Sequence, residues 1–583
     1  MRGKIGLDSL RASFKNALND KWQLAFLAFI VIYATFLALS LPLMPIQWDE
    51  VTHLNGGVFL LRGDYNAYFS FNAFYPPLYD IFSAGFFAVG GISVVTNRMV
   101  SVVFSLLTLY AVFEFARRAY GSKTALLAAL FLGLMPGYIW LSRMAMIETM
   151  LIFFATVSTL FFFSWLRTNQ NKFLILSGLT LGLGILTKYQ LLVVGAIMIT
   201  SMVLLGRGYL KKLARFPLLI LTVVAVVTPW IVVSYQLYAS GMLNTWLYAL
   251  NIGNPDKLLY SFGLNSAGFS RFPDWFFQIP SFIQLPIFYL LELTVPYHDT
   301  HPISFFLYAL GLAGLGFFAW RRKVEDKFLL LWFFVIYIFF TAIPNKQWRY
   351  VVMIFPVLAV SAASLLTSAF HTAQNLWRNR QLTFNQKRFT QLSAGFLIAL
   401  TVLGVGFSVN DAYIWAAKDQ VYIPIRDATE FAGTRLSANE SIVVVCAQNL
   451  FSQDMVRFYL NAMGKNNTVF QYPELPVDTY TPVFNITEFI DLCKQRNVKY
   501  VFTYEFGGDV PYFNTTLSLM GVYTMLYASA SFSKLSDNET VTYGVWPRRI
   551  FILTFLGEAQ LQETRSPSSR LLPSVPLRPS TPR

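Results

Sequence analysis

The sequence predicts a polytopic α-helical membrane protein with a small α/β domain at its C-terminal end, and three observations lead to this fold class. Hydrophobic residues make up 55% of the 583 residues and charged residues only 13%, about half the share typical of soluble domains. Apolar runs long enough to cross a bilayer recur as far as residue 409. From about Asp411 the composition turns polar. The bilayer is therefore expected to be the main solvent of the chain before this point.

The spanning segments follow from the requirement that a membrane helix satisfies its own backbone polar groups over about 20 mostly apolar residues. Residues 1–21 carry basic residues, and no small-residue cleavage site follows, so we expect a retained cytoplasmic N-terminus. Two shorter apolar segments, 76–92 and 276–296, are expected to be interfacial helices on the outer face. The sequence thus predicts eleven spans, at 22–44, 98–116, 123–141, 146–166, 172–188, 190–206, 216–237, 302–320, 328–344, 349–370 and 390–409.

The orientation follows from the positive-inside rule. Lys and Arg gather in alternate loops, such as the run from Arg207 to Arg215, and these loops are assigned to the cytoplasm. An odd number of spans then places the C-terminus outside, in the plasma membrane or in the endoplasmic reticulum membrane of a eukaryote. The net charge of +15 is distributed between apolar runs, which argues against a nucleic-acid partner. All sequons follow the last span and are candidate N-glycosylation sites: Asn439, Asn466, Asn485, Asn514 and Asn538.

The domain boundaries follow from these assignments. Residues 22–409 form the membrane domain, in which 45–97 is a long first outer loop, and 410–556 form an extracytoplasmic α/β domain. Strands are predicted at 441–446, 468–472 and 499–504, and helices at 427–436, 451–463 and 487–496. The tail 557–583 is rich in Pro, Ser and Arg and is expected to be disordered. Cys446 and Cys493 are too few for a disulfide framework, and two buried thiols are favoured over one disulfide.

Charged residues at the outer ends of the spans are the candidate site, because such residues are costly near the bilayer. Asp49 and Glu50 follow the first span, and Glu148 lies between the third and the fourth. Carboxylates can accept a proton from an attacking hydroxyl, and Lys or Arg can neutralise a departing phosphate. The basic residues on the same side are Arg98, Arg143, Lys188, Lys346 and Arg349.

Each of these residues also has a plain structural explanation. A single Lys or Arg at a helix end often anchors the helix at the interface. Glu148 could cap a helix N-terminus, and Asp49 with Glu50 could be an ordinary solvated pair. Convergence of all these residues on one side of the membrane favours function.

In order along the chain, these residues resemble the GT-C superfamily of polyprenyl-phosphate-sugar glycosyltransferases, close to the protein O-mannosyltransferases and the aminoarabinose lipid A transferases. The resemblance runs from Trp22 to about Phe370, and its specificity lies in the order of the motifs, not in any one of them. The motifs are Trp48-Asp49-Glu50, Pro76-Pro77-Leu78-Tyr79, Arg98 to Ser101, Ala116 to Gly121, Arg143 to Glu148 and Leu186-Thr187-Lys188.

The resemblance implies transfer of a sugar from dolichyl or undecaprenyl phosphate to an acceptor hydroxyl, with inversion at the anomeric carbon. Asp49 matches the general base and Glu148 a second acidic position. Glu50, beside Asp49, is a further catalytic candidate that we expect to orient the acceptor. By position, Arg98, Arg143 and Lys188 would contact the lipid phosphate, and Lys346 and Arg349 match a basic position before a late span.

The sequence also departs from these relatives. It lacks the two further spans of the aminoarabinose transferases and the β-trefoil domain of the mannosyltransferases, so the sugar, the acceptor and the oligomeric state stay unassigned. Some relatives use a divalent cation, but the four histidines show no ligand spacing, and we assign no metal; Asp49 with Glu148 could hold one. The alternatives are a transporter or flippase and a scaffold without catalytic activity.

Overall fold

A computed structural model describes the chain in two compact units, one up to Tyr422 with the short segment Tyr543–Val545, and one from Ile423 onward. The structure describes residues 20–71, 75–238, 287–294, 301–342, 347–378, 384–418, 424–445, 451–472, 485–504, 519–538 and 550–556. The predicted tail 557–583 and most of the predicted segment 276–296 lie outside these residues.

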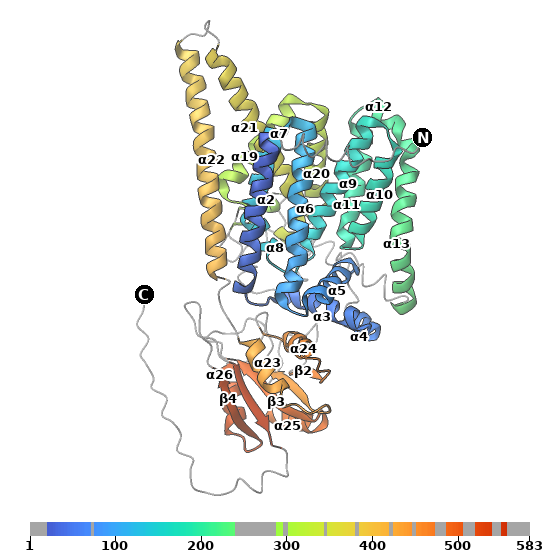
Figure 1. Ribbon diagram of the computed structural model, residues 1–583, viewed down its shortest axis with the longest axis vertical. Coiled ribbons are helices and arrows are strands. Elements are labelled where there is room, and N and C mark those ends of the chain that lie inside the picture. The colour runs from blue at the N-terminus through green and yellow to red at the C-terminus, as the bar shows by residue number, and fades with distance from the viewer. Residues whose placement is uncertain are drawn as a thin grey trace. The chain divides into compact units, whose positions relative to one another are not determined.

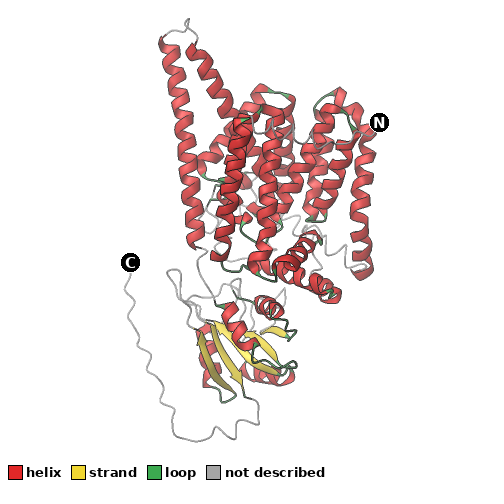
Figure 2. Ribbon diagram, in the orientation of Figure 1, coloured by secondary structure: helices red, strands yellow, loops and turns green. Residues whose placement is uncertain are grey.

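The first unit is a bundle of helices (Figures 1 and 2). Three of its helices, α3, α4 and α5, lie across one end of the bundle, while α21 and α22 extend beyond the other end (Figure 1). The bundle consists of α2 (Lys21–Ser40), α3 (Trp48–Arg62), α4 (Tyr65–Phe71), α5 (Leu78–Gly90), α6 (Val94–Tyr120), α7 (Ser122–Gly133), α8 (Pro136–Ser142), α9 (Glu148–Thr168), α10 (Asn171–Ile185), α11 (Leu192–Leu204), α12 (Arg207–Leu210), α13 (Phe216–Tyr238), α18 (Phe288–Glu292), α19 (Phe305–Arg321), α20 (Val324–Ala342), α21 (Phe355–Arg378) and α22 (Phe384–Lys418), with 3₁₀ turns that include η5 (Trp348–Ile354).

The chain is an integral membrane protein, but the count of eleven spans is not confirmed. Within the described residues, six helices are long and apolar enough to cross a bilayer, or seven if the bent pair α7 and α8 forms one span. Each predicted span coincides with helix, yet α10, α11 and α19 are short and α20 begins with the charged residues Glu325, Asp326 and Lys327. The segment from Leu78 to Gly90 is a short helix, as predicted for 76–92.

Local sequence signals explain where the elements near the outer end begin and stop. The predicted loop 45–97 is largely helical, because Gln47 and Glu50 form a reciprocal capping box at the start of α3. Gly63 ends that helix in the left-handed conformation at φ 68°. Pro136 starts a new helix after α7, and the two axes differ by 72°. These breaks place α3 and α8 at the same end of the bundle (Figure 1).

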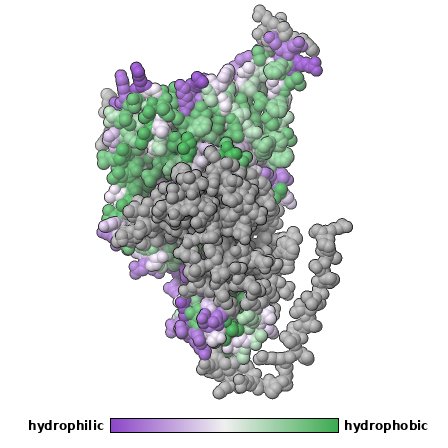
Figure 3. Space-filling view, turned by 180° about the vertical axis from the view of Figure 1, so that it is seen from behind, coloured by the Kyte–Doolittle hydropathy of each residue, from purple (hydrophilic) through white to green (hydrophobic). Residues whose placement is uncertain are grey.

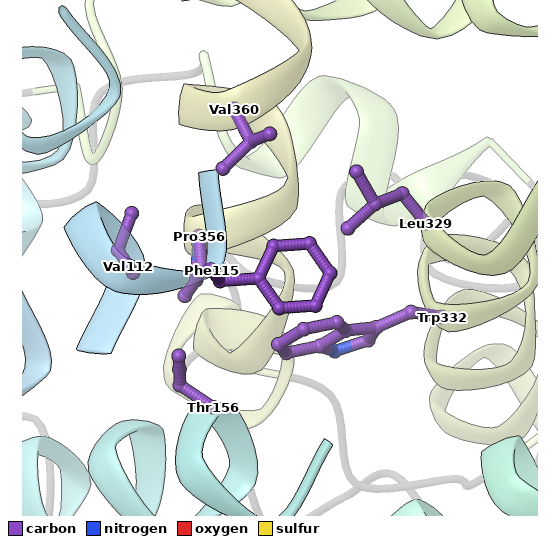
Figure 4. A pocket seen from close by; sticks show the side chains of 7 residues that line it. All are labelled: Val112, Phe115, Thr156, Leu329, Trp332, Pro356 and Val360. Atoms are coloured by element: carbon purple, nitrogen blue, oxygen red, sulfur yellow. The ribbon is translucent and has the colours of Figure 1, made fainter. Parts of the chain in front are cut away.

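Apolar packing holds the bundle together. Hydrophobic residues also cover much of the visible surface of the helical unit, as expected for helices that face lipid (Figure 3). A small apolar cavity inside the bundle is lined by residues from α6, α9, α20 and α21 (Figure 4). Its walls carry no charged side chain, so it is a packing gap and not a candidate site. The lining residues are Val112, Phe115, Thr156, Leu329, Trp332, Pro356 and Val360.

The second unit contains a five-stranded sheet of order β2-β1-β3-β5-β4. β1 pairs in parallel with β2 and β3, whereas β5 pairs antiparallel with β3 and β4. β1, β2 and β3 and the helices α23, α24 and α25 lie where the sequence predicts elements, while β4, β5 and α26 were not predicted. The elements are β1 (Ser441–Val445), β2 (Val469–Tyr472), β3 (Val498–Tyr504), β4 (Phe532–Asn538), β5 (Ile550–Phe555), α23 (Ile425–Gly433), α24 (Gln453–Ala462), α25 (Ile486–Gln495) and α26 (Leu519–Ala528).

Several predictions fall on this unit. Cys493 is a buried free thiol, and burial raises its pKa to about 12, whereas Cys446 lies outside the described residues. Asn439, Asn466 and Asn485 are exposed, as glycosylation requires. Asn514 and the side chain of Asn538 lie outside the described residues, and use of the sequons stays a prediction.

Candidate active site

The neighbouring acids Asp49 and Glu50 at the start of α3 have opposite environments. Glu50 is fully buried, whereas the side chain of Asp49 is 51% exposed. Consecutive residues on a helix point about 100° apart, so one carboxylate turns into the bundle and the other stays at its surface. The capping box fixes this choice, because the Glu50 carboxylate accepts a hydrogen bond from the Gln47 backbone at 2.9 Å.

Glu50 and Arg98 form a buried, fully hydrogen-bonded clamp. Arg98 Nε donates to Glu50 Oε1 at 2.7 Å and Nη2 donates to Oε2 at 2.6 Å. The remaining Arg98 hydrogens go to the backbone carbonyls of the turn after α2, and Glu50 Oε1 also accepts from the Ala145 backbone at 2.6 Å. The carbonyls are those of Leu41, Met44 and Pro45.

This clamp corrects two predictions. Arginine has five N–H groups, and all five of Arg98 are used inside the protein, so none is left for a lipid phosphate. Glu50 is buried and both of its oxygens accept hydrogen bonds inside the protein, which argues against its predicted catalytic role. Both residues instead join α2, α3 and α6 to the Met144–Ile147 turn, the structural framework of the site.

Asp49 pairs with Arg349, a residue 300 positions later in the sequence. Arg349 Nη1 lies 2.7 Å from Asp49 Oδ2, and Arg349 Nη2 donates to the Gln347 side chain at 3.1 Å. Arg349 stands in η5, which is buried at Trp348 against the rings of Trp140 and Trp415. Trp348, directly before it, thus anchors Arg349, whose side chain is 15% exposed.

Glu148 begins α9 and pairs with Lys188. The Lys188 ammonium lies 3.3 Å from Glu148 Oε1 and 5.4 Å from the ring centroid of Tyr350. Glu148 is only 3% exposed, and its second oxygen, Oε2, is buried without a hydrogen bond among the described residues. A buried acceptor left unsatisfied is uncommon and is often met by water or by a ligand.

The remaining basic candidates are Arg143 and Lys346. Arg143 is 4% exposed and donates to the Ser40 carbonyl at 3.3 Å, so it contributes to the framework between α2 and α8. Lys346 lies outside the described residues. Lys188 and Arg349 are therefore the cations that the structure brings together with Asp49 and Glu148.

Tyr75 lies within electrostatic range of Asp49 and Glu148, one acid from each ion pair. Burial raises the pKa of its hydroxyl well above the usual value, and the negative charges of Asp49 and Glu148 raise it further. Tyr350 and Arg349 also lie within electrostatic range of this hydroxyl. Tyr75 is thus a phenol, not a phenolate, over the whole physiological range and can donate a hydrogen bond.

A second buried acid lies behind Tyr75. His53 Nδ1 is 2.8 Å from Asp80 Oδ1, and the Tyr68 hydroxyl donates to Asp80 Oδ2 at 3.1 Å. His53 packs between the rings of Tyr75 and Tyr79, at centroid distances of 5.4 and 4.8 Å. Gly56 allows this approach, because a Cβ there would lie 2.7 Å from Asp80 Oδ2.

The residues do not fit a divalent cation. Within the described residues, no group of three or more His, Cys, Asp and Glu side chains could hold a metal ion. Asp49 and Glu148, the pair named for this role, are each in contact with a cationic side chain. Hard divalent cations prefer several oxygen ligands, so we derive no step through a metal.

Sequence reasoning missed Tyr75, His53, Asp80 and Tyr350 as members of the site. A signal for His53 was present, since it follows Asp49 by four residues and so shares a face of α3. Tyr75 precedes Pro76-Pro77, which restricts its backbone and marks a rigid position.

Comparisons with known proteins agree with the motifs. A family profile described as dolichyl-phosphate-mannose-protein mannosyltransferase matches residues 75–233, which include Tyr75, Glu148 and Lys188 but neither Asp49 nor Arg349. No curated protein sequence matches the chain.

Among solved structures, the apo form of ArnT from Cupriavidus metallidurans is 13% identical, with a TM-score of 0.54 over 91% of this chain and 97% of that chain. The same protein bound to undecaprenyl phosphate is 14% identical, with a TM-score of 0.50 over 91% of this chain and 98% of that chain. The oligosaccharyltransferase of Archaeoglobus fulgidus in complex with Zn and sulfate is 14% identical, with a TM-score of 0.50 over 81% and 67%.

At these identities the structural likeness shows the fold. The profile match over residues 75–233 and the likeness in fold both agree with the resemblance drawn from the motifs.

Proposed function

We propose that the chain is a membrane glycosyltransferase that moves a sugar from a polyprenyl-phosphate donor to an acceptor hydroxyl, with inversion. The observation that carries this proposal is that the pairs Asp49–Arg349 and Glu148–Lys188 lie close together, since Lys188 is 5.4 Å from the ring of Tyr350, the residue after Arg349. These charges come from α3, α9, the end of α10 and η5, which lie far apart in the sequence.

The chemistry follows from the exposed carboxylate of Asp49 and from the cations of the two pairs. The acceptor hydroxyl gives its proton to the Asp49 carboxylate as its oxygen attacks the anomeric carbon from the face opposite the phosphate. The bond between that carbon and the phosphate oxygen breaks, and the phosphate leaves with the electron pair. Lys188 and Arg349 are the cations that stabilise its charge.

The binding of undecaprenyl phosphate by ArnT, which has the same fold, supports a lipid phosphate as the donor's anchor in this chain. The outer face of the membrane is the side that the charge pattern assigns to these residues. The acceptor is then a protein, lipid or glycan on that face.

The test is a transfer assay with purified protein in detergent. The protein is incubated with radiolabelled dolichyl-phosphate mannose, other polyprenyl-phosphate sugars and a membrane extract that supplies acceptors. Label should move from the lipid to a new product with wild-type protein and not with Asp49→Asn.

Two results would overturn the proposal. One is the absence of transfer from every donor. The other is movement of intact donor across reconstituted liposomes without any transfer, which would establish the flippase alternative. Undiminished transfer by Asp49→Asn would instead remove Asp49 as the base.

A further inference from the structure

We infer that Tyr75 binds a neutral oxygen of the sugar being transferred and that the buried pair His53–Asp80 holds it in place. The inference rests on the proposed function and adds a residue that distinguishes the sugar from the lipid phosphate of the donor.

The first step is that Tyr75 has a rigid backbone. The following Pro76 and Pro77 restrict its conformation. The turn is tied to the end of α10, because the Leu78 backbone donates to the Leu186 carbonyl at 3.0 Å, two residues before Lys188. The position of Tyr75 is therefore set relative to the Glu148–Lys188 pair.

The second step is that the Tyr75 ring is held from behind. The His53 ring packs on it, and His53 is itself fixed by the 2.8 Å contact with Asp80, which is fully buried. Buried polar groups need hydrogen-bond partners, and the Tyr68 hydroxyl donates to the second Asp80 oxygen. The contact of the His53 ring with Tyr75 makes this pair the support of the phenol ring.

The Tyr75 hydroxyl is available to form a hydrogen bond with a bound molecule. It forms no hydrogen bond with any residue that the structure describes, although its ring is largely covered. A phenol in such a place loses a hydrogen bond to water unless a bound molecule replaces it.

The charges around the Tyr75 hydroxyl decide what it binds. The negative charges of Asp49 and Glu148 act on it more strongly than the positive charge of Arg349. A phosphate oxygen at this point would be repelled by both carboxylates, whereas a sugar hydroxyl or ring oxygen carries no charge. Lys188 and Arg349 suit the phosphate instead, which leaves the phenol to the sugar.

The test compares two ligands on one protein. The dissociation constants of dolichyl-phosphate mannose, and of any other donor that wild type transfers, are measured beside that of bare dolichyl phosphate. Tyr75→Phe keeps the ring and should weaken the sugar donor about 3- to 10-fold while bare dolichyl phosphate stays within about 2-fold, as expected for one hydrogen bond. Tyr65→Phe is the matched control, because Tyr65 is 60% exposed on α4.

The role of the pair is tested in the same way. Asp80→Asn should reduce the preference for the sugar donor in the same direction as Tyr75→Phe, though less, because it weakens only the support of the ring. A merely structural role would lower the melting temperature without changing the ratio of the two dissociation constants.

Each contrary result has a distinct meaning. Equal weakening of both ligands by Tyr75→Phe would show that the phenol binds the phosphate, and no change in either would remove it from the site. Wild-type protein that binds neither ligand and transfers no sugar would overturn the proposed function itself.

Discussion

Two ion-pair regions at the same end of the membrane unit differ in how completely their hydrogen bonds are satisfied. In the Glu50–Arg98 region, every arginine hydrogen and both carboxylate oxygens are used, and both residues are buried. In the region of Asp49–Arg349 and Glu148–Lys188, each pair has one direct contact, Asp49 is half exposed and Glu148 Oε2 lacks a hydrogen bond.

The difference teaches how to separate framework from site when both are built from the same residue types. A saturated pair can exchange nothing with a ligand, whereas a pair with unsatisfied or exposed oxygens can. Position along the sequence does not tell them apart, since Asp49 and Glu50 are adjacent. The expected effects of mutation therefore differ in kind between the two regions.

The largest effect is expected from Asp49→Asn, which removes the proposed base. Turnover should fall by about two to four decades, because general base catalysis contributes that much. The melting temperature should stay near that of wild type, since an exposed pair contributes at most about 1 kcal/mol. Steady-state kinetics and thermal unfolding measure the two quantities. A normal turnover, or a large loss of stability, would place Asp49 with the framework.

The next effect is expected from Arg98→Met, which leaves Glu50 buried without its cation. Unfolding should become easier by about 3–5 kcal/mol, measured as a lower melting temperature and a lower yield of folded protein. The double variant Arg98→Met with Glu50→Gln should recover part of this loss, because no buried charge is then unpaired. If Arg98→Met were as stable as wild type but could not bind a donor, Arg98 would belong to the phosphate site after all.

A smaller effect is expected from Lys188→Ala in the open region. Donor binding should weaken about 10-fold through loss of one charge-assisted contact, with a smaller change in stability than for Arg98→Met. The measurement is the dissociation constant of dolichyl phosphate, and Arg207→Ala on α12 serves as the control. Equal losses in both variants would mean that total positive charge, and not the Glu148–Lys188 pair, attracts the lipid.

The smallest effect is expected at Glu292, an acid outside both pairs. Burial raises its pKa to about 7, so the folded state disfavours its charged form. The unfolded chain loses this proton near pH 4.5, so the carboxyl lowers stability increasingly as the pH rises from there toward 7. Glu292→Gln should thus raise stability by about 1 kcal/mol at pH 8 and by less at pH 5. Thermal unfolding at the two pH values checks the sign, and an equal gain at both would refute it.

Much of the fold could be predicted from the sequence because hydrophobic length and period are local properties. Every predicted span coincides with helix, and β1, β2 and β3 lie within one or two residues of their predicted limits. The number of spans could not be settled in this way, since α10, α11 and α19 are apolar but short. β4 was missed because the mostly polar run Ser533–Asn538 gives no strand pattern on its own. β5 was missed although its apolar run Ile550–Phe555 fits a buried strand.

For the site, the sequence could predict which side of the membrane its residues lie on, but not which side chains pair with one another. The charge pattern brought Asp49, Glu148, Lys188 and Arg349 to one side, and the structure places these four together. The charge pattern could not show that Arg98 would turn toward Glu50, because 48 residues separate them and the contact depends on how α3 packs. The capping box at Gln47 and Glu50 was the one local hint that Glu50 faces inward.

The adjacency of Asp49 and Glu50 has a consequence for the descent of such proteins. One residue of the dipeptide maintains the fold and the other is proposed to perform the reaction, so selection acts on each for a different reason. A lineage that no longer needed transfer could replace Asp49 and keep a stable, membrane-inserted protein. Replacement of Glu50 would instead destabilise the fold, so that little folded protein would be made. A relative with an unchanged Glu50 and a substituted Asp49 is therefore what a pseudoenzyme of this fold would look like.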